Sequence, residues 1–292
     1  MAAVKGFSVR FRGRHLFFVN VPKLVLFLFL GLLVCFTALP LVYVVSTAFK
    51  PIDELYLFPP RFFTSKPTLN NMASLFSALD SSAVPFSRYI FNTVFITAVA
   101  ILGHVIVASM AAYVLEKRQF PGGKAFFKLV VTTLMFTTAV TQIPSFIIMT
   151  QLGWVDTYTS IIVPAFGAPI GLYLMKQFMS GIPDSLLEAA KIDGSSEWRT
   201  FWTIVMPNVK PAWLTLIIFS IQTLWGTTGG VYIFSEEKKT LSYAMSQIVA
   251  GGVARAGAGA AVGVIMMIVP ITVFIVSQRN IIQTMASSGM KD

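Results

Sequence analysis

The sequence has few charged residues. Only 12% of its 292 residues are Asp, Glu, Lys or Arg, about half of the roughly 25% that is usual in soluble globular domains. Apolar residues make up 55% of the chain, and the mean hydropathy is +0.76. This composition excludes an ordinary soluble enzyme and an unfolded chain, and it favours the lipid bilayer as the solvent.

The sequence also lacks the residues that several kinds of site require. Its single cysteine, Cys35, excludes an intrachain disulfide and a cysteine-based metal site. The phosphate-binding motif Gly-x-x-x-x-Gly-Lys-Ser/Thr is absent, because residues 122–124 (Gly-Gly-Lys) lack its upstream glycine and are followed by alanine. The histidines, His15 and His104, are isolated from any nucleophile. We therefore expect no catalytic residue, no metal ion and no cofactor in this chain.

Six apolar segments reach or approach the roughly 20 residues that a membrane-spanning helix needs. None contains an acidic residue. The first follows a basic segment, as in a signal peptide, but its apolar length exceeds the roughly 7–15 residues of a cleavable signal, so we predict a retained anchor. The sequence thus predicts an all-α, polytopic membrane protein with six transmembrane helices in a single domain, residues 1–292. The segments are residues 24–49, 89–115, 126–152, 158–175, 212–230 and 257–276.

Basic residues are distributed unevenly between the two sides of such a chain. Fifteen of the 22 Lys and Arg residues fall on the side of both termini and of the second and fourth loops, while six acidic residues fall on each side. Because cytoplasmic loops carry the excess of Lys and Arg, both termini are predicted to be cytoplasmic. The excess of basic residues then reflects the orientation of the chain in the membrane, and nucleic acid is not expected as a partner. The outer loops, residues 50–88 and 231–256, are rich in proline or glycine, which predicts irregular structure with short helices.

The fourth loop, residues 181–207, has the pattern of two short helices. Pro183 suits the first position of a helix, and Gly194 suits a left-handed C-terminal cap. A second helix is predicted from a serine cap at residue 195 or 196 until Pro207 ends it. We predict a compact cytoplasmic helix pair between the fourth and fifth transmembrane helices.

Two interpretations of this helix pair are open from the residues alone. It is either a hairpin that stabilises the bundle or a docking site for another protein. For docking, the small Ala189 and Ala190 allow close approach, while Glu188 and Asp193 offer carboxylates to a partner's Arg or Lys.

The same residues resemble the signature loop of binding-protein-dependent ABC importer permeases. In that family Glu-Ala-Ala is followed after three residues by Gly, and after nine more by Ile-x-Leu-Pro. Glu188-Ala189-Ala190, Gly194, Ile204 and Pro207 stand at these intervals, with Met206 in place of Leu. The resemblance extends along most of the chain and is closest to the second permease of maltose-type carbohydrate importers. Further matching residues are Pro67-Thr68-Leu69-Asn70, Asn92-Thr93 and Ser288-Gly289-Met290-Lys291.

The resemblance implies a membrane-spanning subunit of an ATP-driven carbohydrate importer in a prokaryotic plasma or inner membrane. A second permease would form the other half of the pathway, a dimer of ATPase subunits would bind ATP and magnesium, and an extracytoplasmic solute-binding protein would deliver the sugar. Residues 181–207 would be the coupling loop that docks on the ATPase. The coupling residues implied are Glu188, Ala189, Ala190, Asp193, Gly194, Ile204 and Pro207.

Uncharged polar residues in the apolar segments are candidates for the substrate path. Gln222 and Trp225 lie in the fifth segment, and Thr141 and Gln142 lie in the third. Neutral hydrogen-bonding groups with an aromatic face hold polyhydroxyl ligands, but the same groups also join helices in membranes. The lack of mid-span carboxylates disfavours an ion-driven carrier. The alternatives kept are a self-sufficient secondary transporter or channel, and a membrane assembly subunit that moves no solute.

Overall fold

Every regular element is a helix within the residues that the computed structural model describes, which are 21–80, 84–118 and 120–288. In these ranges four helices are long and apolar enough to cross a membrane, and a fifth candidate is a pair of helices with a 77° bend. The predicted all-α membrane fold is confirmed, whereas the count of six stays a prediction. The candidates are Pro22–Ala48, Phe86–Lys117, Thr159–Met179, Ala256–Gln278, and Glu197–Asn208 with Lys210–Trp225.

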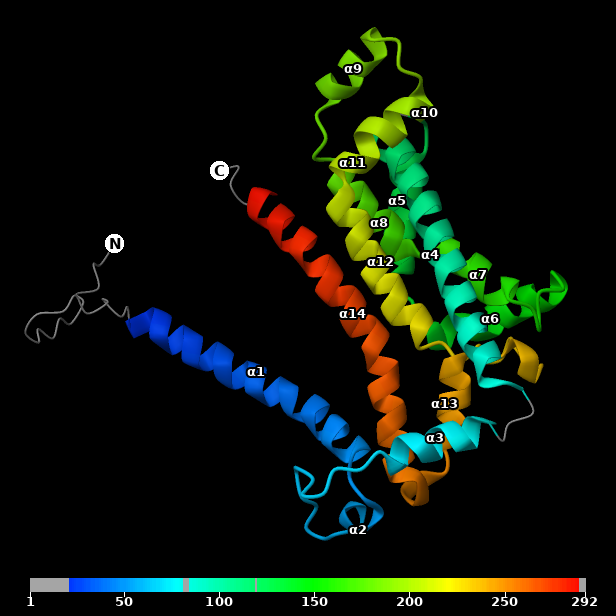
Figure 1. Ribbon diagram of the computed structural model, residues 1–292. Helices are drawn as coiled ribbons and strands as arrows, with labels where there is room; N and C mark the ends of the chain where they lie inside the picture. Colours follow the sequence, from blue (N-terminus) through cyan, green and yellow to red (C-terminus); the bar gives the residue numbers. More distant parts are fainter. Residues whose placement is uncertain (1–20, 81–83, 119, 289–292) are drawn as a thin grey trace, which may run out of the picture.

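The helix α4 (Phe86–Lys117) lies at the centre of the bundle. It packs against α7 (Thr159–Phe166), α8 (Pro169–Met179) and α12 (Lys210–Trp225), as Figure 1 shows. Ala112 of α4 is fully buried in the apolar core that α4 shares with α8 and α12. Small residues of this kind let helix backbones approach closely in a membrane.

His104 lies where α4, α8 and α12 meet. Its ring nitrogens lie 3.0 Å from Ser220 Oγ and 3.2 Å from the carbonyl oxygen of Ala168, and the residue is buried. A Cβ atom at Gly171 would lie 2.1 Å from Nε2 of His104, so the glycine allows this close approach. His104 is therefore a packed polar residue of the helix interface.

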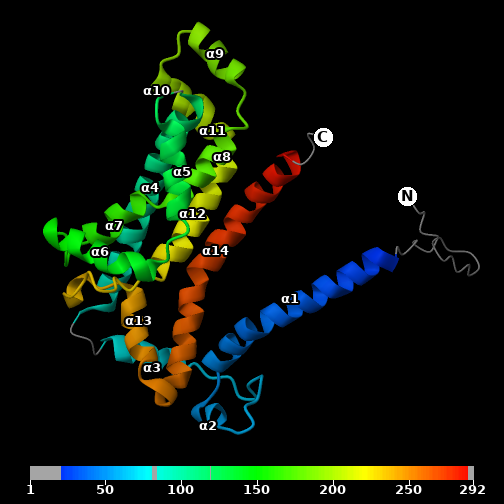
Figure 2. The same cartoon turned by 180° about the vertical axis from the view of Figure 1, so that it is seen from behind.

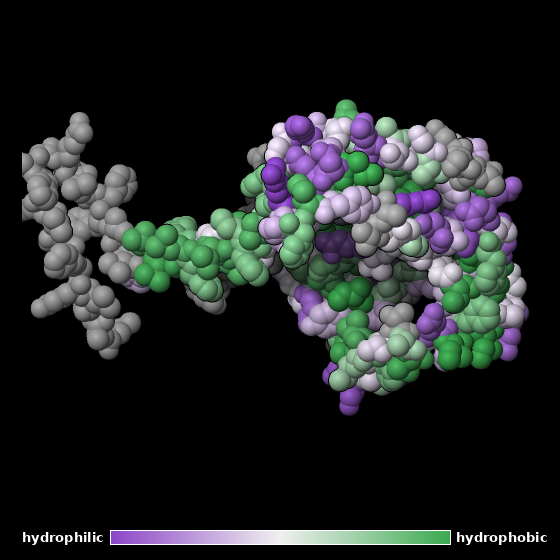
Figure 3. Space-filling view, turned by 90° about the horizontal axis from the view of Figure 1, so that it is seen from below, coloured by the Kyte–Doolittle hydropathy of each residue, from purple (hydrophilic) through white to green (hydrophobic). Residues whose placement is uncertain are grey.

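The helix α1 (Val21–Ala48) diverges from the bundle. Near its C-terminal end it contacts α14 (Ala256–Ser288), where Gly263 faces Val44. The start of α1 and the end of α14 both point toward the end of the molecule that carries α9 (Asp184–Ile192) (Figures 1 and 2). The most apolar window of α1 has no buried residue, and Figure 3 shows hydrophobic residues along the helix. A helix that is apolar all round belongs in lipid or against another membrane helix.

The third predicted span, residues 126–152, is two helices and not one. α5 (Gly123–Thr133) packs against α8, and α6 (Thr138–Gln151) follows after a break. The hydroxyl groups of Thr132 and Thr133 donate to backbone carbonyl oxygens about one turn earlier, at 2.9 and 2.6 Å. Runs of threonine weaken a helix because their hydroxyls compete for its backbone hydrogen bonds and their side chains are β-branched. The single helix expected from hydropathy was therefore wrong.

The fifth predicted span, residues 212–230, ends earlier than expected. Its helix α12 stops at Trp225. Gly229 and Gly230 then have φ values of +80° and +50°, a left-handed conformation that a right-handed helix cannot contain. The last five residues of the predicted span therefore belong to the connection that follows.

Short helices occupy the connections at both ends of the bundle, as Figure 1 shows. This confirms the prediction of short helices in the loops at residues 50–88 and 231–256. The short helices in these two loops are α2 (Ile52–Leu55), α3 (Asn70–Asp80), η2 (Glu236–Lys238), α13 (Leu241–Val249) and η3 (Gly252–Arg255). The helices at the opposite end are α9, α10 (Glu197–Thr200), η1 (Phe201–Val205) and α11 (Met206–Asn208).

Candidate functional site

The helix α9 has the local structure that its sequence predicts, apart from its first residue. Pro183 precedes the helix as its N-cap residue, one position before the place expected. Gly194 has φ +77°, which confirms the predicted left-handed cap. The amide of Ser195 donates to the carbonyl oxygen of Ala190 at 2.9 Å and closes this end of the helix. The glycine thus turns the chain sharply out of α9.

The second helical segment starts as predicted but continues further. The hydroxyl of Ser196 accepts a hydrogen bond from the amide of Arg199 at 3.3 Å, which confirms a serine cap. A π-helix, η1, follows, and α11 extends the helical run to Asn208. The prediction that Pro207 ends the helix was wrong. Pro207 lies in the first turn of α11, where proline is tolerated.

Polar contacts tie both parts of this loop to the end of α4. Lys117 Nζ lies 2.8 Å from Asp184 Oδ1 and donates to the carbonyl oxygen of Ile182 at 2.6 Å. Arg118 forms an ion pair with Glu197. The hydroxyl of Tyr113 donates to Glu197 Oε2 at 3.0 Å. The loop is therefore in direct polar contact with the C-terminal end of α4.

Apolar packing fixes the second half of the loop in the bundle. Phe201 is buried, and its ring centroid lies 5.5 Å from that of Tyr113 on α4. Val205 and Met206 are buried in the same core, together with Met179 of α8. η1 and α11 are thus part of the bundle, whereas α9 projects beyond it (Figure 2).

The exposed surface of α9 and α10 carries both carboxylates and large apolar side chains. Neither Glu188 nor Asp193 forms a side-chain hydrogen bond or an ion pair with any other described residue. Ile192 is 85% exposed and Trp198 of α10 is 60% exposed. Such a surface suits a partner that supplies basic groups and an apolar pocket.

The structure brings the seven predicted coupling residues into one loop, with different surroundings. Ala190 is buried against its own loop, and Ile204 is half-buried. The others are exposed. These are Glu188, Ala189, Asp193, Gly194 and Pro207.

The four residues predicted for the substrate path lie on two helices. Trp225 is buried between α12 and α14, where its Nε1 donates to the carbonyl oxygen of Met266 at 3.1 Å. Gln222, on the same helix, is exposed, as are Thr141 and Gln142 on α6. The environment of Trp225 is that of a packing residue, whereas the other three side chains are accessible.

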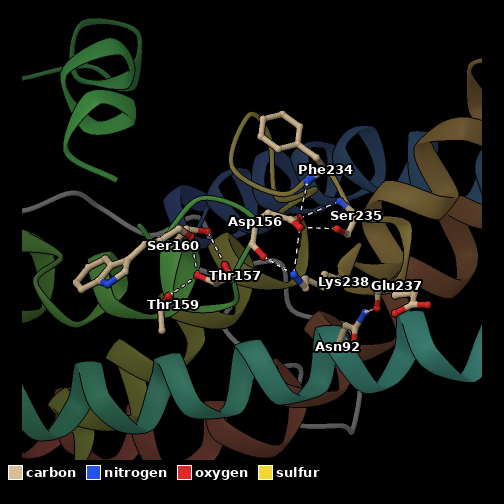
Figure 4. A network of polar contacts seen from close by, with 10 residues as sticks. Asn92, Asp156, Thr157, Thr159, Ser160, Phe234, Ser235, Glu237 and Lys238 are labelled. Carbon is tan, nitrogen blue, oxygen red and sulfur yellow. Dashed lines mark hydrogen bonds and ion pairs between the residues drawn. The ribbon is translucent and has the colours of Figure 1, made fainter. Parts of the chain in front are cut away.

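Sequence reasoning missed a polar network centred on Asp156, in the connection between α6 and α7 (Figure 4). Its Oδ1 accepts from the backbone amides of Phe234 and Ser235 at 3.0 and 2.9 Å, and Ser235 Oγ donates to Oδ2. Lys238 Nζ donates to the backbone oxygen of Asp156 at 2.6 Å and lies 3.1 Å from Oδ2. The hydrogen bonds from Ser235 hold the pKa of Asp156 well below its usual range. Its φ of +58° is a conformation that Asp tolerates better than most residues.

The same end of the bundle is held by Asn92 and Thr93 of α4. Asn92 is fully buried, and its amide nitrogen donates to the carbonyl oxygens of Glu237 and Lys239, each at 2.8 Å. The hydroxyl of Thr93 accepts from the amide of Leu241 at 2.7 Å. Figure 4 shows the Asn92 contact beside the Asp156 network. Residues 234–241 are therefore fixed to two parts of the chain.

The chain belongs to the family of binding-protein-dependent transport system inner membrane components, whose family model matches residues 105–287. The match includes the loop with α9 and the helices that carry it. The chain is thus a transport permease with several membrane-spanning helices.

Two relatives and one solved structure give the extent of the likeness. The chain is 30% identical over 266 residues to the arabinooligosaccharides transport system permease protein AraQ of Halalkalibacterium halodurans, which covers 86% of this chain and 90% of the relative. It is 32% identical to the sn-glycerol-3-phosphate transport system permease protein UgpE of Yersinia enterocolitica, over 60% of this chain and 63% of the relative. Its fold matches a chain in the crystal structure of a bacterial ABC transporter involved in the import of the acidic polysaccharide alginate, with a TM-score of 0.74, 22% identity, and coverage of 93% and 99% of the two chains.

Proposed function

We propose that this chain is one of two permease subunits of an ATP-driven importer for an oligosaccharide or related sugar. The relative AraQ, whose match covers 86% of this chain, is named as a permease of an arabinooligosaccharide transport system. The chain would line half of the pathway, while ATP and magnesium would be bound by a separate dimer of ATPase subunits. A solute-binding protein outside the membrane would deliver the sugar.

One observation carries the coupling role. α9 projects from the bundle with two carboxylates, Glu188 and Asp193, that have no partner among the described residues, while the chain on either side of it is tied to α4. An ATPase subunit that binds α9 and moves during its ATP cycle would pull on Lys117 and Arg118. The pull would reach α4 and, through η1, the bent pair of helices that ends at Trp225.

The proposed orientation has both termini and the α9 loop in the cytoplasm. The end of α14 and α9 lie toward the same end of the molecule, in agreement with the excess of Lys and Arg predicted for that side (Figure 1). The Asp156 network then lies at the outer end, where the binding protein would dock.

The test reverses one charge at each end of the molecule. Glu188→Lys is expected to abolish co-purification of the ATPase subunits, because the carboxylate would lose its basic partner and repel it. Glu237→Lys is the matched control for ATPase content, since its side chain is also exposed and unpaired among the described residues but lies at the opposite end. ATPase content is measured in purified complexes, and uptake in proteoliposomes.

Full retention of ATPase and uptake in Glu188→Lys would refute the docking role. Uptake by the purified chain alone, driven by an ion gradient, would support a secondary transporter instead. The substrate class is tested separately by binding of oligosaccharides and of glycerol phosphate to the solute-binding protein. Loss of uptake in Gln222→Ala with normal assembly would place that residue on the path.

A further inference from the structure

The connection between α1 and α3 buries two charged side chains and exposes large apolar ones, beside the exposed Asp53 and Arg61. Its buried side chains are charged, since Lys50 and Glu54 are only 2% and 6% exposed. Its apolar side chains face outward: Phe58 is 96%, Ile52 70% and Phe63 67% exposed. A loop in water shows the opposite arrangement, and a contiguous exposed apolar surface marks contact with another molecule or phase. We call residues 52–63 the aromatic loop.

The buried charges fix the shape of the aromatic loop. Lys50 Nζ donates to the carbonyl oxygen of Arg61 at 2.5 Å and lies 4.7 Å from the centre of the Tyr43 ring. Both carboxylate oxygens of Glu54 accept from the amide of Ser65, each at 3.1 Å. These bonds pair both buried charged side chains with backbone groups of the same connection.

The aromatic loop folds back along α1. The ring of Phe62 lies 5.5 Å from that of Tyr43, and the ring of Phe63 lies 5.0 Å from that of Phe62. Phe62 and Phe63 therefore extend the aromatic surface of the loop onto the C-terminal part of α1. Aromatic residues gather at the boundary of headgroups and acyl chains in membranes.

We propose that the aromatic loop inserts into the interfacial layer of the lipid leaflet at the C-terminal end of α1, with Phe58 and Phe63 as the inserted side chains. Lipid is the favoured occupant because the apolar surface of the loop continues that of α1, which has no buried residue in its most apolar window. Figure 1 shows α2 and the adjoining loop under the end of α1, to one side of α3 and α13. The loop would fix the height of α1 in the bilayer.

The test measures the depth of single spin labels in the assembled importer. Cys35→Ser removes the single cysteine of this chain, and the partner chains are made cysteine-free. Nitroxides are attached to Phe58→Cys and, separately, Phe63→Cys, in bilayers of phosphatidylcholine and phosphatidylglycerol. Lys66→Cys is the matched control, an exposed residue of the same connection outside the aromatic loop. Accessibility to oxygen, which concentrates in lipid, is compared with accessibility to a water-soluble nickel chelate.

The proposal expects the ratio of oxygen to nickel accessibility at positions 58 and 63 to exceed that at position 66 about fivefold or more. Higher nickel accessibility at both positions would place the loop in water and overturn the proposal. Low accessibility to both reagents would mean that a protein partner covers the loop, which would also overturn it. Because Phe58 is almost fully exposed, its replacement removes no packing within the chain.

Discussion

Glu188 and Asp156 both lie in connections between helices of the bundle, and their surroundings are opposite. Asp156 accepts hydrogen bonds from Phe234, Ser235 and Lys238, and so joins two segments of its own chain. Glu188 has no such partner among the described residues, on a helix that projects from the bundle and is linked to α4 through Asp184. A carboxylate satisfied within the chain stabilises the fold. A carboxylate left unsatisfied on an exposed helix is available to another chain.

The contrast between the α9 loop and the connection with Asp156 is tested most strongly by introducing the same backbone strain into each. Gly194 and Gly153 have φ of +77° and +67°, and a Cβ atom at either would meet no neighbour. Valine at either position costs on the order of 1–2 kcal/mol, because a β-branched residue disfavours this conformation. Gly194→Val is expected to lower uptake in proteoliposomes more than tenfold, and Gly153→Val less than twofold. Equal losses in the two variants would contradict a special role for the α9 loop.

The contrast between buried and exposed polar groups extends to α12. Trp225→Ala is expected to lower the stability of the chain by about 3 kcal/mol, because it opens a cavity between α12 and α14. Gln222→Ala removes an exposed side chain and is expected to change stability by less than about 0.5 kcal/mol. Thermal unfolding in detergent measures both. Loss of uptake in Trp225→Ala at an unchanged unfolding temperature would assign Trp225 to the substrate path instead.

The Asp156 network predicts a stability effect that Glu188 does not share. Asp156→Ala removes the acceptor of several hydrogen bonds and is expected to cost about 2 kcal/mol, a value moderated by the partial exposure of the site. Glu188→Ala is expected to leave the unfolding temperature unchanged, since its side chain has no partner to lose among the residues that the structure describes. Similar unfolding temperatures for the two variants would refute the distinction.

A smaller effect is expected from pH. Because the pKa of Asp156 is lowered in the folded chain, its stabilising contribution is complete above the usual carboxyl pKa of about 4 and declines as the pH falls toward the lowered value. The unfolding temperature of the wild type is expected to exceed that of Asp156→Asn by about 2–4 °C at pH 6. The difference is expected to narrow at pH 3. A constant difference across this range would show that the pKa of Asp156 is the same in the folded and unfolded chains.

The local features of the α9 loop were predictable from the sequence, because they depend on few neighbouring residues. The left-handed Gly194 and the capping Ser196 follow from the conformational preferences of glycine and serine. The apolar composition likewise predicted the membrane helices.

Features that depend on contacts between distant segments were not predictable. Nothing beside Asp156 in the sequence indicates that residues 234–238 face it, although a charged run at 236–239 was visible. Hydropathy also could not show that Trp225 points toward α14, because it averages over the faces of a helix. The break between α5 and α6 was missed because threonine scores as nearly neutral in hydropathy but weakens helices locally.

The acceptors of the Asn92 amide are synthesised long after Asn92 itself. Its buried amide donates only to carbonyl oxygens of Glu237 and Lys239, which leave the ribosome about 145 residues later. At roughly 5–20 residues per second, that interval is on the order of 7–30 seconds. During this time the amide nitrogen of Asn92 lacks its native acceptors, although its Oδ1 can already accept from the hydroxyl of Tyr158. Translation of residues 234–241 is therefore the event that completes this end of the bundle.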